Sequence, residues 1–96
     1  MSGARVQVED GRVIVEGELS FATVPALATP PWPQGDAPVT VDLGGVRRAD
    51  SAGLALLLEW ARAARRQGRP IRFVHTPEQL KSLARVTGVN AILALD

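Results

Sequence analysis

The sequence predicts a single α/β domain with a mixed β-sheet of about four to five strands, covered mostly on one face by helices. Two alternating β-branched segments on either side of Asp10-Gly11 predict an opening hairpin. Strand-like and helix-like segments then alternate along the chain, which is typical of right-handed crossovers and a partly parallel sheet. At 96 residues the chain is short enough that we expect one domain, residues 1–96.

The first half of the chain contains the hairpin and a proline-rich loop. The hairpin strands are expected at residues 5–9 and 12–17, where apolar and polar residues alternate. Residues 20–28 predict a short helix capped by Ser20. The prolines and glycine of residues 29–38 oppose regular structure and predict a loop.

The second half alternates strands and helices. We expect, in order, a strand at 39–43 that ends at Gly44-Gly45, a helix from 51 to about 67, a strand at 71–75 and a helix from 77 to about 86. Asp50 or Ser51 is expected to cap the first of these helices, and Thr76 the second. Residues 91–95 fit either a short strand or a helical tail.

Composition and charge argue against several classes of function. Eleven Lys and Arg against ten Asp and Glu give a net charge of +1, which predicts no general attraction to nucleic acid or acidic membranes. The chain has no cysteine and one histidine, so we expect no disulfide and no zinc site. Without a secretory signal or a membrane-spanning run, we expect a cytoplasmic protein.

Candidate catalytic groups are sparse. Asp42 and Asp50 are expected to flank a turn at Gly44-Gly45 and could meet in space. However, no histidine or lysine has a spacing suited to activating a nucleophile beside them. There is also no glycine-rich phosphate loop followed by lysine. The sequence therefore predicts a protein that is not an enzyme and that binds no metal or cofactor.

The helix expected at 51–67 is more apolar than is needed to cover a sheet. At about 100° per residue, its apolar positions occupy an arc of about 220°, against roughly 100° for a surface helix. The excess comes from a flank that contains Leu56 and Trp60. Either this flank packs against a neighbouring element of the same domain, or it stays exposed until another protein covers it, with Trp60 as the anchor.

The turn before this helix has the features of an interface. Ser51 has an ordinary explanation as a helix cap, but Gly53 costs up to about 1 kcal/mol against alanine, which predicts close approach of another backbone. A helix N-terminus tolerates negative charge, so phosphorylation of Ser51 would add about −1.5 to −2 charges without unfolding the domain. The turn therefore favours a protein interface, with Ser51 as a candidate switch.

The segment DSAGLALLL resembles the STAS family, which includes anti-sigma factor antagonists and sulfate-transporter tails. The family pattern is a strand ending in Asp-Leu, followed by Asp-Ser/Thr-x-Gly-Leu at the start of a helix. Asp42-Leu43 and residues 50–54 match this pattern, and VEGELS at residues 15–20 is similar to the end of the family's second strand. The resemblance implies a STAS-like fold over nearly the whole chain, although the PPWPQG loop fits no family motif.

Within the family, the sequence is most similar to the small cytoplasmic subunit of Mla-type phospholipid-transport ABC complexes. This resemblance implies a non-catalytic regulatory or assembly subunit, peripheral to the inner membrane, that binds the ATPase subunit (MlaF-like) beneath the permease. We expect the contact to comprise Ser20, Phe21, Asp50, Ser51, Gly53, Leu56 and Trp60. The alternative is an anti-sigma factor antagonist that a kinase switches by phosphorylating Ser51.

Overall fold

The computed structural model describes residues 3–96, and its first feature is the hairpin that the sequence predicts. β1 (Ala4–Glu9) and β2 (Arg12–Leu19) pair antiparallel. Asp10 and Gly11 between them have φ of 51° and 75°, the left-handed values of a type I′ turn. The hairpin is therefore confirmed, and its second strand runs beyond the expected end.

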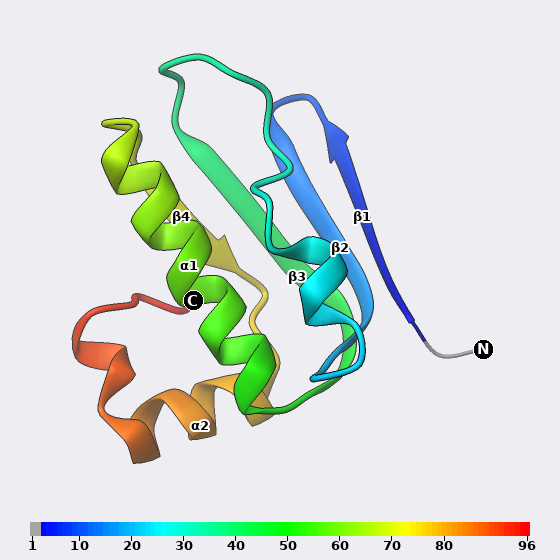
Figure 1. Cartoon of the computed structure of the whole chain (residues 1–96). Helices are drawn as coiled ribbons and strands as arrows, with labels where there is room; N and C mark the ends of the chain where they lie inside the picture. Colours follow the sequence, from blue (N-terminus) through cyan, green and yellow to red (C-terminus); the bar gives the residue numbers. More distant parts are fainter. Residues whose placement is uncertain (1–2) are drawn as a thin grey trace.

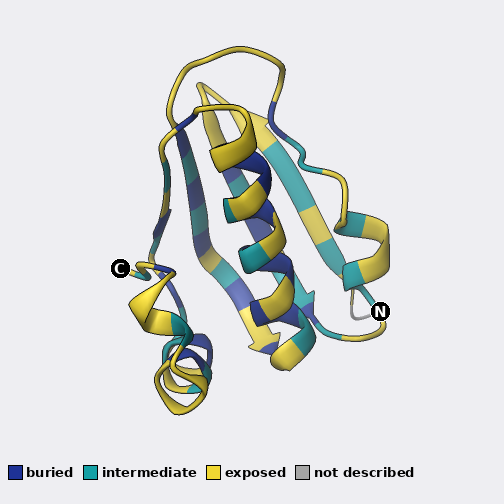
Figure 2. Ribbon diagram, turned by 60° about the vertical axis from the view of Figure 1, so that its left-hand side comes forward, coloured by how far each residue is buried: buried dark blue, intermediate teal, exposed yellow. Residues whose placement is uncertain are grey.

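The remaining strands extend the hairpin into one mixed sheet (Figure 1). β3 (Val39–Ala49) pairs parallel to β2, and β4 (Ile71–Val74) pairs parallel to β3. The order across the four-stranded sheet is therefore β1-β2-β3-β4. The helices lie on one face of this sheet, as Figures 1 and 2 show, so the predicted mixed sheet covered mostly on one face is confirmed.

β3 is longer than the sequence predicts, because Gly44-Gly45 does not end it. Against β2, β3 gains one extra residue between Asp42 and Gly45. This is a β-bulge, which bends a strand without ending its pairing. A side chain at position 45 would lie 2.7 Å from Cγ of Glu16, so glycine is needed where the bulged strand passes β2. The expected turn here is wrong, and the chain continues as strand to Ala49.

α1 (Ser51–Arg66) crosses the sheet and supplies much of the core. Asp50 is its N-cap and accepts a hydrogen bond from the Ala52 amide at 2.8 Å, which decides between the two predicted caps. Leu56 and Trp60 are 2% and 1% exposed. Of the two interpretations of the apolar flank, packing within the domain is therefore the one observed, and the expectation of an exposed flank is wrong.

The segment between β2 and β3 explains this burial. The Ser20 hydroxyl accepts the amide of Ala22, but only a turn and the 3₁₀ turn η1 (Val24–Leu27) follow where a helix over residues 20–28 was expected. The Trp60 indole donates to the carbonyl of Leu27 at 3.1 Å. Trp32, from the proline-rich loop, packs edge-on against Trp60 with ring centroids 6.2 Å apart. The loop thus seals the flank of α1.

The last elements lie beside the start of α1 and along β4. α2 (Glu78–Thr87) begins after Pro77 without a side-chain cap, so the expected cap at Thr76 is wrong. The chain then forms a short 3₁₀ turn, η2 (Val89–Ala91). The tail is neither of the expected alternatives, since a single bridge joins Leu95 to Phe73. Figure 2 shows burial concentrated on the inner side of α1 and the strands beneath it.

Candidate functional site: the Ser51 corner

The end of β2 and the start of α1 meet at one end of the sheet. The amide of Asp50 donates to the carbonyl of Leu19 at 3.0 Å, which joins the two chain segments. A Cβ atom at Gly53 would lie 2.9 Å from both Cβ and the carbonyl oxygen of Leu19. The predicted close approach of another backbone to Gly53 is therefore present, and this backbone belongs to the chain's own second strand.

Asp50 links the helix start to the turn that follows β2. One carboxylate oxygen accepts the Ala52 amide, and the other accepts the Phe21 amide at 3.3 Å. The backbone of Phe21 is thereby held beside the first turn of α1. We call the group formed by Ser20, Phe21, Asp50 and Ser51 the Ser51 corner.

Hydroxyl groups hold the turn after β2 from within. The Ser20 hydroxyl donates to Oε2 of Glu18 at 2.7 Å and accepts the Ala22 amide at 3.3 Å. The Thr23 hydroxyl donates to the carbonyl of Glu18 at 2.7 Å and accepts the Ser20 amide at 2.9 Å. Ser20 therefore shapes the corner, and with its hydroxyl engaged it is half-buried.

Exposure divides the seven predicted contact residues into three groups. Phe21 is 74% exposed, and Ser51 is also exposed. Ser20 and Asp50 are half-buried, and their side chains form the hydrogen bonds that shape the corner. Three residues, Gly53, Leu56 and Trp60, are buried within the domain. Hydrogen bonds thus link the segments that carry the first four residues, whereas Gly53, Leu56 and Trp60 are buried in the single chain. The partner contact itself stays a prediction.

Three residues that support the corner were not identified from the sequence: Glu18, Thr23 and Gln79. The Thr23 hydroxyl reaches back three residues to the Ser20 amide, a local pattern typical of Ser and Thr that a sequence can indicate. Gln79 of α2 accepts the amide of Ala49 at 3.1 Å, just before the corner. No local pattern indicates this bond, since the two residues are 30 positions apart.

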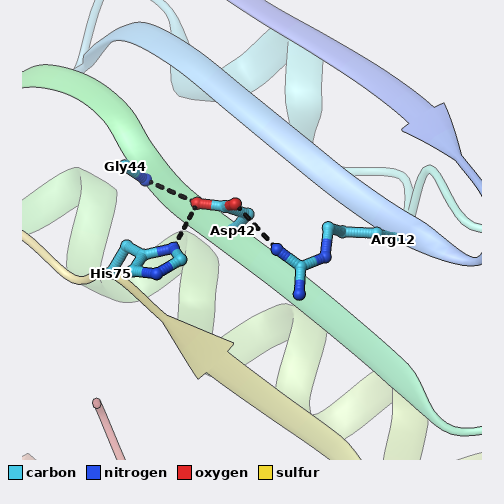
Figure 3. A network of polar contacts seen from close by, with 4 residues as sticks. All are labelled: Arg12, Asp42, Gly44 and His75. Atoms are coloured by element: carbon cyan, nitrogen blue, oxygen red, sulfur yellow. Dashed lines mark hydrogen bonds and ion pairs between the residues drawn. The ribbon is translucent and has the colours of Figure 1, made fainter.

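A second polar group lies on the sheet face that α1 does not cover (Figure 3). Asp42 of β3 accepts from Arg12 of β2 at 3.0 Å, from the Gly44 amide at 2.9 Å, and contacts Nδ1 of His75 at 3.1 Å. Partial burial raises the pKa of Asp42, but the Gly44 amide, the His75 ring and the Arg12 guanidinium together hold it below its ordinary value of 3.8. The group braces three neighbouring chain segments.

Asp42 and Asp50 serve separate structural purposes. Asp42 bonds across the outer face of the sheet, whereas Asp50 caps α1, and they share no hydrogen-bond partner. The expectation that they could meet beside a glycine turn is wrong, because β3 continues as a strand past Gly44-Gly45 to Ala49. Within residues 3–96, no cluster of three His, Cys, Asp or Glu side chains could hold a metal ion. In the same residues, no helix is long and apolar enough to cross a membrane.

The four-stranded mixed sheet carries its helices on one face, and the Asp-Ser-x-Gly corner stands at the start of the central helix. The family comparison assigns a chain with this arrangement to the STAS domains. A family model described as the MlaB STAS domain matches residues 2–94, and the chain belongs to this family. A search of curated proteins returns no match.

Solved structures share the fold at low sequence identity. An anti-sigma factor antagonist from Mycobacterium paratuberculosis is 22% identical with a TM-score of 0.67, over 96% of this chain and 82% of that chain. The murine anion transporter Solute Carrier 26 family member A9, in its inward-facing state, is 18% identical with a TM-score of 0.68. That match covers 98% of this chain and 20% of the transporter, so the present chain corresponds to one part of the larger protein.

Proposed function

We propose that this chain is a non-catalytic regulatory or assembly subunit of an Mla-type phospholipid-transport ABC complex, and that the Ser51 corner binds the cytoplasmic ATPase subunit. Membership of the MlaB STAS family supports the class of partner. The observation that carries the proposal is that Phe21, 74% exposed, and Ser51, also exposed, lie on the two chain segments that the Asp50 carboxylate joins. The protein would thereby lie at the cytoplasmic side of the inner membrane through its partner.

The chemistry of the corner suits a protein contact. An exposed phenylalanine ring offers a large apolar anchor with few rotatable bonds, as interface hot spots do. Ser51 is small and neutral, so a partner can approach the start of α1 without desolvating a charge. The side chain of Asp50 is engaged by two backbone amides, and its negative charge is partly compensated by the helix N-terminus.

The buried residues behind the corner act indirectly. Leu56 and Trp60 pack inside the domain and hold α1 against the sheet. Gly53 lets the first turn of α1 approach Leu19. Their substitution would weaken binding only through the fold, which distinguishes them from Phe21 and Ser51.

Affinity purification of the tagged chain from solubilised membranes tests the proposal. The native chain should recover an ATPase subunit and a permease, while Phe21→Ala and Ser51→Glu recover neither and remain folded. Val86→Ala and Ser82→Glu are matched controls on α2, since both positions are exposed there. Recovery of no transporter subunit by the native chain would refute the proposed partner.

The second candidate is an anti-sigma factor antagonist switched by phosphorylation of Ser51. The fold shared with the mycobacterial antagonist and the exposure of Ser51 favour it. Phosphorylation would place about −1.5 to −2 charges at the start of α1, where the backbone amides favour an anion and the Asp50 carboxylate opposes it. Incubation with a cognate anti-sigma kinase and ATP, followed by intact mass, tests it. A stoichiometric phosphate that Ser51→Ala abolishes would support the antagonist and count against the transporter subunit.

A further inference from the structure

The outer edge of β1 lacks several of the features that usually protect an edge strand. β1 pairs with β2 over six consecutive residues without a bulge, and it contains neither proline nor lysine. Natural edges usually carry such features because an open strand pairs readily with another chain. The opposite edge is different: β4 has only four residues, and the tail covers part of it through the bridge from Leu95 to Phe73. Among residues 3–96, no strand pairs with the outer side of β1, which Figure 1 shows at the border of the sheet.

The hairpin geometry determines which backbone groups this edge offers. In a two-residue hairpin the two residues that flank the turn, here Glu9 and Arg12, bond to each other through their backbones. Every second residue before Glu9 then bonds to β2 in the same way, which gives Gln7 and Arg5. The amide of Glu18 donates to the carbonyl of Gly3 at 2.9 Å, in phase with this alternation. The amides and carbonyls of Val6 and Val8 therefore point away from β2.

We propose that the edge of β1 pairs with β1 of a second copy of this chain, antiparallel and centred on Gln7. This register places Val6 opposite Val8 of the second copy, so that their outward amides and carbonyls bond in reciprocal pairs. The valine side chains meet on the helix-covered face, where Val8 is 41% exposed in the single chain. The two sheets then join into one continuous sheet, an isologous contact of the kind that a two-fold axis generates.

Charge complementarity favours a second copy of β1 as the partner strand, and it favours the register centred on Gln7. On the uncovered face, the register centred on Gln7 sets Arg5 of each chain opposite Glu9 of the other. Within each hairpin, Arg5 already lies opposite Glu16, and Glu9 opposite Arg12. The joined sheet thus carries a row of alternating charge: Glu16, Arg5, then Glu9 and Arg12 of the second copy. Opposite charges at facing positions stabilise paired strands, and like charges destabilise them.

The neighbouring registers lose this match. The outward amides and carbonyls of the two β1 strands can also bond if the dimer is centred on Val6 or on Val8. In the first register Arg5 faces the neutral Gln7 of the second copy, and in the second register Glu9 does. The contact is one strand wide and smaller than a standard protein interface, so it defines a weak, concentration-dependent dimer. This inference does not depend on the partner of the Ser51 corner.

Sedimentation equilibrium over a wide range of concentration tests the proposal. The native chain should be a monomer when dilute and approach a dimer as concentration rises. Arg5→Glu and Glu9→Arg should each raise the dissociation constant by about tenfold or more, because each change acts at two symmetric positions. An equimolar mixture of the Arg5→Glu and Glu9→Arg chains restores both pairs between unlike copies, while each chain keeps the hairpin charges it has alone. The mixture should therefore dimerise more tightly than either variant by itself, to within about threefold of the native value. Arg66→Glu, exposed at the end of α1, is the matched charge control and should have no effect.

Amide hydrogen exchange provides a readout that does not depend on the variants. In the dimer, the amides of Val6 and Val8 should become protected as concentration rises, while those of Gln7 and Glu9 are protected throughout. A native chain that stays monomeric at millimolar concentration would overturn the proposal. So would a dimer whose Val6 and Val8 amides gain no protection, or a mixture of the two single variants that binds no more tightly than each variant alone.

Discussion

Gly53 is the residue at which helix propensity and packing make opposite predictions. An alanine at this position would favour the helical state by up to about 1 kcal/mol, since glycine is a poor helix residue. Its Cβ atom would however lie 2.9 Å from both Cβ and the carbonyl oxygen of Leu19, and 3.5 Å from Cβ of Ala49. Two of these contacts are closer than real Cβ atoms accept, and one involves backbone. Over-packing of this kind costs about 1–3 kcal/mol.

The packing cost should outweigh the propensity gain. We expect Gly53→Ala to lower the free energy of unfolding by about 1 kcal/mol, which corresponds to roughly 4–8 °C in Tm for a domain of this size. Urea denaturation monitored by circular dichroism measures it directly. Ala55→Gly, at an exposed position of the same helix, measures the propensity contribution separately. An unchanged or higher stability of Gly53→Ala would refute the argument that Leu19 and α1 require a glycine here.

Three further substitutions test individual hydrogen bonds and ion pairs that stabilise the fold. Trp60→Phe leaves the Leu27 carbonyl without its donor and should lower the free energy of unfolding by about 1–3 kcal/mol, measured by urea denaturation; stability within error of native would contradict the observed bond. Asp50→Ala removes the cap of α1 and should cost about 1 kcal/mol in the same assay, whereas no loss would show the cap to be dispensable. The pKa of Asp42 is lowered in the folded state by the Gly44 amide, the His75 ring and the Arg12 guanidinium, so these interactions stabilise the fold above the unfolded pKa. That stability is lost as pH falls through the folded pKa. Stability against pH should therefore fall less steeply below about pH 4 in Asp42→Asn than in the native chain, and parallel curves would contradict the shift.

The elements that could be predicted from sequence are those with local signals. The hairpin follows from alternation around Asp10-Gly11, and α1 from a capping residue before an apolar run. The length of β3 could not be predicted in this way. Its bulge at Gly44-Gly45 depends on the pairing with β2, about 30 residues earlier in the chain. The glycine pair therefore predicted the end of a strand, whereas in the fold it allows β3 to continue past Glu16 of β2.

The candidate site was predicted in position but not in composition. The Asp-Ser-x-Gly pattern located the corner, because the cap and the helix start are local features. Whether Leu56 and Trp60 are exposed depends on distant residues: Trp60 is covered by Trp32 and bonds to Leu27. Arg69 illustrates the same limit, since it belongs to the arginine-rich segment yet is buried, donating to the carbonyls of Ala37 and Pro33.

The central claim is that Ser51 and Phe21 form the contact that a partner ATPase covers. The most direct measurement is the affinity of the purified ATPase subunit for the native chain and for Ser51→Glu, by titration calorimetry, with Ser82→Glu as the control. Ser51→Glu should weaken binding by at least about tenfold, or about 1.4 kcal/mol, with Tm within a few degrees of native. Equal affinity of native and Ser51→Glu chains would contradict it.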